Sequence, residues 1–153
     1  MSYFEILANH FRLNRKRSDN FHLLKAAMAA CAVVSAADGF TCVKESRRVR
    51  ELMRALKLLQ LYDVKLGHDL FMADSQRLLA EGDSVLPEMM EKVALADGDE
   101  EACRLIVELC KSISEADGIV YPSEDQAIER ICALLHFDVK QAERINLPRP
   151  AEF

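Results

Sequence analysis

The sequence has little of what sheet proteins and loop-rich proteins need. Among 153 residues there are five glycines, four prolines and no tryptophan, and aromatic residues make up only 7%. Turn-forming residues are therefore scarce, and no stretch alternates apolar and polar residues as a half-buried strand does. Half of the residues are hydrophobic, with alanine and leucine dominant, which favours helices. Since a chain of this length can bury a sizeable core, we expect one all-α domain.

The cysteines do not form the patterns of a disulfide framework or a zinc ribbon. There are five of them, an odd number, and no C-x-x-C pair occurs. Cys31, Cys110 and Cys132 lie among apolar residues at helical spacing, where a thiol behaves as a small hydrophobic side chain. We interpret them as reduced core residues of a cytoplasmic protein.

Long hydrophobic runs are missing as well. The longest uncharged apolar stretch, AAMAACAVVSAA at 26–37, is well short of the roughly 20 residues that span a bilayer. The first residues also do not resemble a signal peptide, because polar residues interrupt them and a basic cluster follows. We therefore expect a protein that neither spans the membrane nor is exported.

The net charge of −5 hides an asymmetry. Residues 1–17 carry four basic side chains against one acidic one, which gives +3, so the remainder carries −8. An acidic body argues against a general nucleic-acid binder and suits a cationic partner.

Helical periodicity runs through almost the whole chain. Apolar residues recur every three or four positions in successive segments, and together with a short final helix these segments predict a bundle of about seven helices. One helix is expected over 63–79. Pro87 fits the first turn of the next, opened by Asp83 or Ser84, and Asp99 is expected to cap the helix after that.

The chain also repeats itself at an offset of 79 residues. The stretch SAADGFTCVKE at 35–45 matches SEADGIVYPSE at 114–124, and the apolar positions on both sides correspond. We interpret this as a duplication, with copies at about 24–70 and 103–145. Two copies of a helical pair usually pack about an approximate twofold axis, which would bring the two acidic turns near each other.

The repeated turn has a purely structural interpretation. Gly39 and Gly118 are well placed to end a helix in the left-handed conformation. In the second copy Pro122 then takes the first position of the next helix, and Glu124 takes the third, where a carboxylate meets unbonded backbone N–H groups. On this interpretation the glycine closes one helix and the glutamate caps the next.

The alternative is a site for a hard cation. Asp38 with Glu45, and Asp117 with Glu124, place carboxylates beside the carbonyls of a helix end, and oxygen ligands suit calcium or magnesium. The spacing D-G-x5-E matches the second half of an EF-hand loop. The first half fails, because Val34 or Ile113 stands where an acidic ligand is needed. We therefore expect a weak, water-rich site, strongest if both copies contribute.

At this point the sequence resembles the TerB family of bacterial tellurite-resistance operons. The resemblance rests on the MSYF start, on CAVVSAADG and on ISEADGIVYPSEDQAIERICALLHFD, and it extends over about residues 1–146. It implies an all-helical fold with internal pseudo-symmetry, which we place at 18–147. A basic amphipathic segment at 1–17 precedes this domain and a tail at 148–153 follows it.

The resemblance also implies a function. The family's acidic cluster is proposed to bind divalent metal in metal or oxyanion stress, and the protein to act without enzymatic activity, through partners encoded beside it that include a membrane protein. The family's acidic positions fall on four residues of the two turns, with one further candidate ligand beside them: Asp38, Glu45, Asp117, Glu124 and Asp125. The first copy departs from the family pattern, because Val43 and Lys44 replace the usual acids before Glu45.

Three other functions are compatible with the residues. A thiol-based oxyanion reductase would use the cysteines, yet Cys103 and Cys110 are two helical turns apart, about 10.5 Å in rise, too far for a disulfide. A co-chaperone accessory domain is a second option. A membrane-surface adaptor is a third, because residues 1–17 combine an apolar stripe with the basic cluster.

Overall fold

The structure is a computed structural model that describes residues 20–39, 43–58, 62–116, 118 and 121–138. Within these residues there are six α-helices, two short 3-10 helices and no strand, which confirms the predicted all-α class. The elements are α2 (Asn20–Ala36), α3 (Val43–Leu58), α4 (Val64–Glu81), η1 (Gly82–Ser84), α5 (Leu86–Val93), η2 (Ala94–Ala96), α6 (Glu100–Ser114) and α7 (Pro122–Leu134). The expected short final helix, the segment 1–17 and the tail 148–153 lie outside the described residues.

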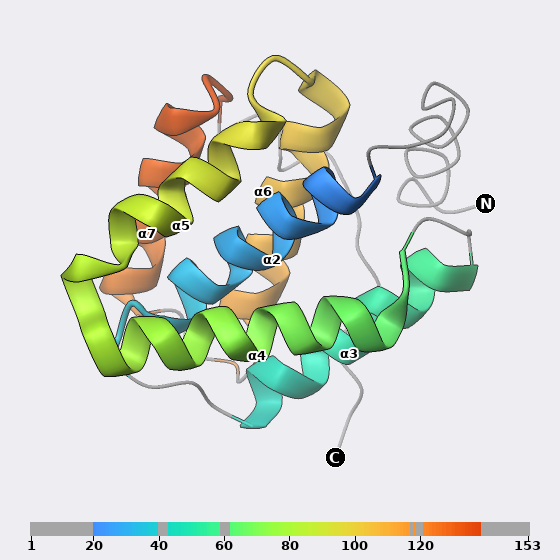
Figure 1. Cartoon of the computed structure of the whole chain (residues 1–153), viewed down its shortest axis with the longest axis horizontal. Helices are drawn as coiled ribbons and strands as arrows, with labels where there is room; N and C mark the ends of the chain where they lie inside the picture. Colours follow the sequence, from blue (N-terminus) through green and yellow to red (C-terminus); the bar gives the residue numbers. More distant parts are fainter. Residues whose placement is uncertain (1–19, 40–42, 59–61, 117, 119–120, 139–153) are drawn as a thin grey trace.

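Helix α2 lies at the centre of the bundle and packs against α4, α5, α6 and α7 (Figure 1). Its sequence explains this position, since five alanines on all sides of the helix are buried: Ala26, Ala27, Ala29, Ala30 and Ala32. A helix that is apolar all round must be enclosed, and small side chains let neighbouring helices approach closely. None of the helices in the described residues combines the length and the apolar character needed to cross a membrane.

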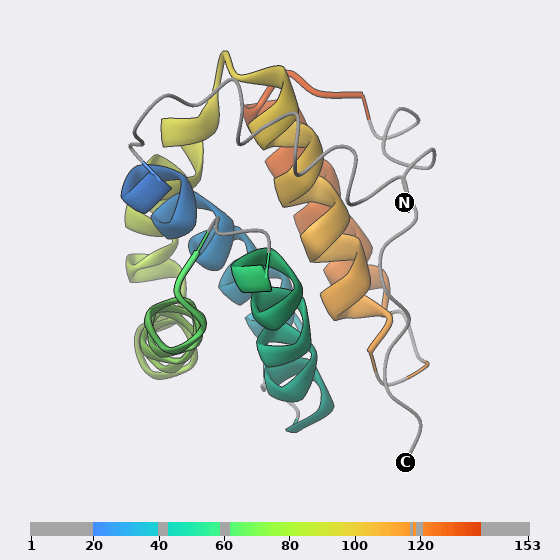
Figure 2. The ribbon, with the colours of Figure 1, turned by 90° about the vertical axis from the view of Figure 1, so that its right-hand side faces the viewer.

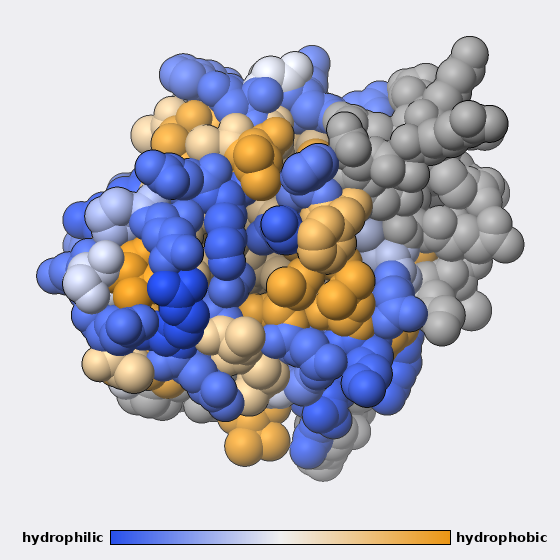
Figure 3. All heavy atoms as spheres, viewed as in Figure 1, coloured by the Kyte–Doolittle hydropathy of each residue, from blue (hydrophilic) through white to orange (hydrophobic). Residues whose placement is uncertain are grey.

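The outer helices are amphipathic, as their periodicity predicts. In α3 the buried residues Val49, Leu52, Met53 and Leu56 recur at helical spacing, and the arginines between them give the helix a charged face. Hydrophilic residues cover most of the face seen in Figure 3, and apolar residues form separate patches, the largest over α2 and α4.

Local capping signals set several helix boundaries. Asp63 precedes α4 and accepts a hydrogen bond from the Leu66 N–H at 2.9 Å, and Asp99 caps α6 in the same way, as predicted. The start of α5 differs from the expectation, because Ser84 turns its hydroxyl back to the Glu81 carbonyl at 2.9 Å. The 3-10 turn η1 thus takes up the residues that were expected to cap α5.

The internal duplication is visible as pseudo-symmetry. Helices α2 and α3 correspond to α6 and α7, and Val43 and Pro122, which begin α3 and α7, are equivalent at the offset of 79. Where α2 and α6 pack together, the equivalent thiols of Cys31 and Cys110 are neighbours, and Cys31 raises the pKa of Cys110. Equivalent residues meet only near a twofold axis, so an approximate axis passes close to this pair. In Figure 2 the ends of α2 and α6 and the starts of α3 and α7 all lie at the lower end of the bundle.

Candidate functional site

The second acidic turn connects α6 to α7 and is capped by its own glutamate. Gly118 has φ +80° and donates its N–H to the Glu115 carbonyl at 3.0 Å. After Pro122 at the first position of α7, the Glu124 carboxylate accepts a hydrogen bond from the Tyr121 N–H at 3.3 Å. Because Glu124 is only 1% exposed, its carboxylate lies under the turn and not on the surface. This half of a capping box is the structural role that the sequence predicts.

The first acidic turn has the same geometry where the structure describes it. Gly39 has φ +95°, and its N–H bonds the Ala36 carbonyl at 3.0 Å. Glu45 is the third residue of α3 and is 2% exposed, just as Glu124 is buried at the third position of α7. Asp38 is half-buried beside the end of α2. The two turns therefore place one buried carboxylate each at the start of a helix, where the backbone N–H groups favour negative charge.

The predicted metal ligands differ in their placement. Glu45 and Glu124 are buried, Asp125 is exposed on the first turn of α7, and Asp117 lies outside the described residues. Among the residues that the structure describes, no three His, Cys, Asp or Glu side chains come close enough together to hold a metal ion. The five-residue ligand set therefore stays a prediction.

A buried arginine joins the two copies on one side of the pseudo-axis. Arg48 of α3 is 3% exposed, and its Nε donates to the Ser112 hydroxyl of α6 at 2.7 Å. Its Nη1 also pairs with Glu51 at 3.1 Å. Burial lowers the pKa of the Arg48 guanidinium, while the nearby carboxylates of Glu51 and Glu115 act in the opposite direction. The start of α3 is thereby held against the end of α6, so each copy contributes to the surroundings of the other copy's turn.

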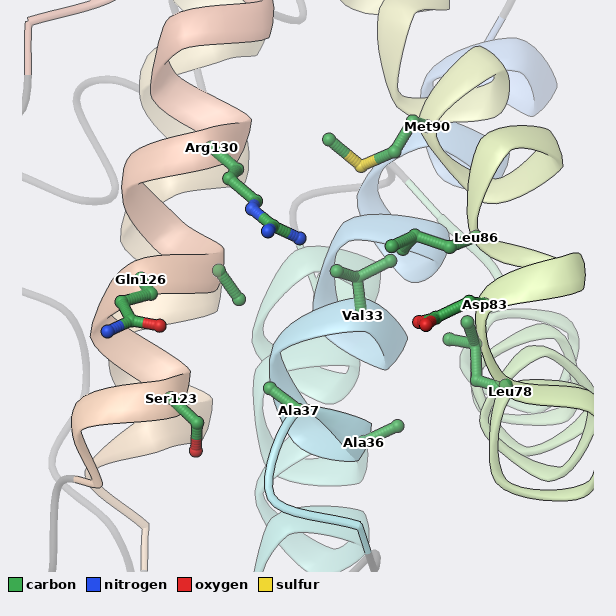
Figure 4. A pocket seen from close by; sticks show the side chains of 12 residues that line it. Val33, Ala36, Ala37, Leu78, Asp83, Leu86, Met90, Ser123, Gln126 and Arg130 are labelled. Carbon is green, nitrogen blue, oxygen red and sulfur yellow. The ribbon is translucent and has the colours of Figure 1, made fainter.

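On the other side of the pseudo-axis, the equivalent interface between α2 and α7 contains a cavity. The start of α7 faces the end of α2 across a space of about 280 Å³, with α5 and the end of α4 as the far wall (Figure 4). Val33 and Ala127 line it, and at the offset of 79 these residues correspond to Ser112 and Arg48. Both interfaces lie at the end of the bundle that carries the acidic turns. Sequence reasoning identified neither Arg48 nor the cavity, although the repeat register marks Arg48 and Ala127 as an unequal pair.

The described thiols are not placed for chemistry. Cys31, Cys103, Cys110 and Cys132 are all buried. Burial raises the pKa of Cys103 and that of Cys132 to about 11, and the neighbouring Cys31 together with burial raises the pKa of Cys110. A thiol must be ionised to act as a nucleophile, and the raised pKa keeps Cys103, Cys110 and Cys132 protonated at neutral pH. Cys42 lies outside the described residues.

These features define a class: a small all-α domain built from a duplicated helix pair, with a capped acidic turn in each copy. Comparison with known families gives the second step. Residues 24–147, most of the chain, match the family described as Tellurite resistance protein TerB. The chain belongs to the TerB family, as the sequence motifs predict. No curated protein and no solved structure matches it.

Proposed function

We propose that this TerB-family protein is a non-enzymatic binding module. It holds a divalent cation, calcium or magnesium, weakly at its acidic turns, and it acts through protein partners in a stress response. The observation that carries this proposal is that both pairs of helix ends flanking the turns lie at one end of the bundle (Figure 2). On one side Arg48 joins the two copies, and on the other side a cavity separates them. Carboxylates from the two copies thus lie at the same end of an acidic protein.

The glutamates and the aspartates of the acidic turns have different parts in this proposal. Glu45 and Glu124 hold the helix starts, which leaves Asp38, Asp117 and Asp125 to face a cation together with backbone carbonyls of the turns. Neighbouring carboxylates repel one another, and a cation relieves that repulsion. Cation binding would therefore tighten the two helix ends and the interfaces that they form.

The partners would be other tellurite-resistance proteins, among them a membrane protein that brings this chain to the inner membrane from the cytoplasm. Family membership and the acidic surface support this part of the proposal. The burial of the four described thiols, and the raised pKa of Cys103, Cys110 and Cys132, argue against tellurite reduction by those cysteines.

The test is an NMR titration with calcium and then magnesium, followed residue by residue. We expect saturable shifts centred on the two turns, weakened by Asp38→Asn and by Asp117→Asn, with the stronger loss in the second copy. A matched control is Asp69→Asn, which removes an exposed carboxylate on the second turn of α4. Shifts that never saturate, or that are weakened equally by Asp69→Asn, would contradict the cation site. Helix capping would then be the one role of the acidic turns.

A further inference from the structure

The cavity opposite Arg48 has the shape and lining of a docking groove. Its floor is the last turn of α2, with Val33 and Ala36. One wall is α7, and the other is formed by the end of α4, η1 and α5, where Leu86 and Met90 contribute apolar side chains (Figure 4). The polar residues stand on the walls, and Figure 4 shows the Arg130 guanidinium directed toward the space from α7. An apolar floor with a polar rim is the usual anatomy of a protein interface.

The duplication explains why this space is open. In the first interface the long Arg48 side chain lies between α3 and α6 and bonds Ser112. In the second interface Ala127 replaces Arg48 and is too short to reach across the space, and Val33 replaces Ser112 and has no hydroxyl to accept a hydrogen bond. The bundle therefore keeps one interface closed by its own side chain and leaves the other without a counterpart.

The charges in the open interface are also changed. Arg130 stands at the position equivalent to Glu51, so a cation replaces an anion. Asp83 faces the space from η1 on the opposite wall. Within the described part of the chain, neither side chain takes part in an ion pair. The groove thus offers one positive wall, one negative wall and an apolar floor.

We propose that this groove docks an amphipathic helix of a partner protein. One or two long apolar side chains, such as leucine or methionine, would enter between Val33 and Met90. An acidic residue on one flank of that helix would face Arg130, and a basic residue on the other flank would face Asp83. The proposal rests on the proposed function, because it supplies the surface for the partner that the function requires.

The size of the cavity favours a helix over a small metabolite. About 280 Å³ accommodates one or two apolar side chains and lies just below the usual range of small-molecule pockets, roughly 300–1,000 Å³. The space also lies between helices and over a helix, the setting in which a partner helix is bound through anchors spaced three or four residues apart.

The groove is connected to the acidic turns along the chain. Its floor includes Ala36 and Ala37, which directly precede Asp38, and its α7 wall begins at Ser123, which directly precedes Glu124. A cation that tightens these helix ends would set the spacing of α2 and α7, and so the width of the groove. Cation and partner would then bind with positive coupling.

The test uses three synthetic alanine-rich helical peptides with leucine at two positions four residues apart. They differ only in the residues that flank the leucine stripe. The Glu/Lys peptide has Glu on one flank and Lys on the other, the Glu/Glu peptide has Glu on both flanks, and the Lys/Lys peptide has Lys on both. The direction in which the helix lies need not be known, because a Glu/Lys peptide can turn end to end in the groove and so place Glu beside Arg130 in either case. With the native protein we expect saturable NMR shifts at Val33, Met90 and Gln126, and an affinity for the Glu/Lys peptide on the order of fivefold above the other two.

Single charge reversals provide the matched controls. Arg130→Glu makes both walls acidic and should shift the preference to the Lys/Lys peptide, whereas Asp83→Lys should shift it to the Glu/Glu peptide. Ala127→Leu fills the groove from α7 and should abolish binding of all three peptides while the protein stays folded, as its NMR spectrum will show. Both reversals are at exposed positions, so neither is expected to unfold the chain.

Three results would overturn the proposal. The first is the absence of saturable shifts at the groove with any peptide at millimolar concentration. The second is a peptide preference that stays the same in both charge reversals. The third is saturation of the same residues by sodium hexanoate as tightly as by the Glu/Lys peptide, which would define a small-carboxylate site. The calcium titration is independent of these peptides, so failure of the groove is distinguishable from failure of the cation site.

Discussion

At the scale of single residues, each acidic turn is followed by a buried glutamate at the third position of the next helix, Glu45 in α3 and Glu124 in α7. A carboxylate here satisfies backbone N–H groups that the helix itself leaves unbonded. In the second copy Glu124 does this while 1% exposed, because the carboxylate folds back toward Tyr121. Helix capping is therefore the first function of this glutamate.

Loss of this cap should destabilise the protein. We expect Glu124→Ala to lower the free energy of unfolding by about 1 kcal/mol, the usual cost of a lost cap. Urea denaturation followed by circular dichroism measures the change. Glu129→Ala is the control, because Glu129 is exposed farther along α7 and its loss should stay within about 0.5 kcal/mol. Equal effects of the two substitutions would contradict the capping role.

His68 should make stability depend on pH. Its Nε2 lies 2.9 Å from the Ser46 hydroxyl, and burial, with the nearby Arg50 charge, lowers the pKa of His68 below its usual value. The unfolded chain then binds the proton more readily, so the folded state loses stability as the pH falls from about 6.5, the ordinary histidine value, toward the lowered pKa.

Denaturant titrations between pH 7.5 and 5.5 test this expectation. The difference in unfolding free energy between the native protein and His68→Gln should shrink as the pH falls, since glutamine does not titrate. A difference that is constant over this range would show that the His68 pKa is the same in the folded and unfolded chain.

The buried thiols should resist alkylation. With iodoacetamide at pH 7.5, we expect the four described thiols to stay unmodified in the native protein and to react fully in urea: Cys31, Cys103, Cys110 and Cys132. All four are buried, and the pKa of Cys103, Cys110 and Cys132 is raised as well. Peptide mass spectrometry identifies the modified positions. Rapid native alkylation at any of the four would revive a thiol-based activity.

At the scale of elements, the contact between α3 and α4 depends on one glycine. Gly67 of α4 is buried against Met53 of α3, and a Cβ atom at Gly67 would lie 2.9 Å from the Met53 sulfur and 3.3 Å from its Cγ. Met53 is itself 1% exposed, so it has little room to move aside. A side chain at position 67 would therefore have to displace the end of the Met53 side chain within a buried contact.

Gly67→Ala should destabilise the protein in spite of the higher helix propensity of alanine. In a helix interior alanine is more stabilising than glycine by about 0.5–1 kcal/mol, whereas an overpacked core is destabilised by about 1–3 kcal/mol. We expect a net loss of about 1 kcal/mol in urea denaturation. Met53→Leu, which shortens the opposing side chain, should recover part of this loss in the double variant. No recovery would mean that the strain lies elsewhere.

At the scale of the whole molecule, the two copies are joined differently on the two sides of the pseudo-axis. One side is closed by a buried guanidinium, and the other holds the groove. A duplication creates two equivalent interfaces. Replacement of one long side chain by a short one can then open one interface while the other stays closed. Arg48 thus joins the copies in one interface, and the other interface is the surface that we propose for partner binding.

The closed interface should contribute strongly to stability. We expect Arg48→Ala to cost about 2 kcal/mol, since it removes a buried hydrogen bond to Ser112 and an ion pair with Glu51. In a double-mutant cycle with Ser112→Ala the coupling should be about 0.5–2 kcal/mol. Arg104→Ala, which breaks only the surface pair with Glu100, should cost under about 0.5 kcal/mol. A cycle without coupling would show that the two copies are held together by apolar packing alone.

Much of this architecture could be predicted from local patterns. The periodicity predicted helices, Asp63 and Asp99 predicted two of their starts, and the glycines predicted the left-handed helix ends at Gly39 and Gly118. The start of α5 was predicted incorrectly, because a 3-10 turn competes with a side-chain cap there and the hydrogen bond to Glu81 favours the turn. The family assignment from the repeated motifs was confirmed over residues 24–147.

The sequence by itself determined the all-α class, several helix ends and the duplication, because these depend on interactions between residues close together in the chain or on comparison of the chain with itself. Only the tertiary structure decided that α2 and α6 meet at Cys31 and Cys110, that Arg48 bonds Ser112, and that the equivalent space at Ala127 is open. These contacts join residues tens of positions apart. They depend on how the buried helix α2 crosses its neighbours, which the packing of the whole core sets and no local pattern specifies.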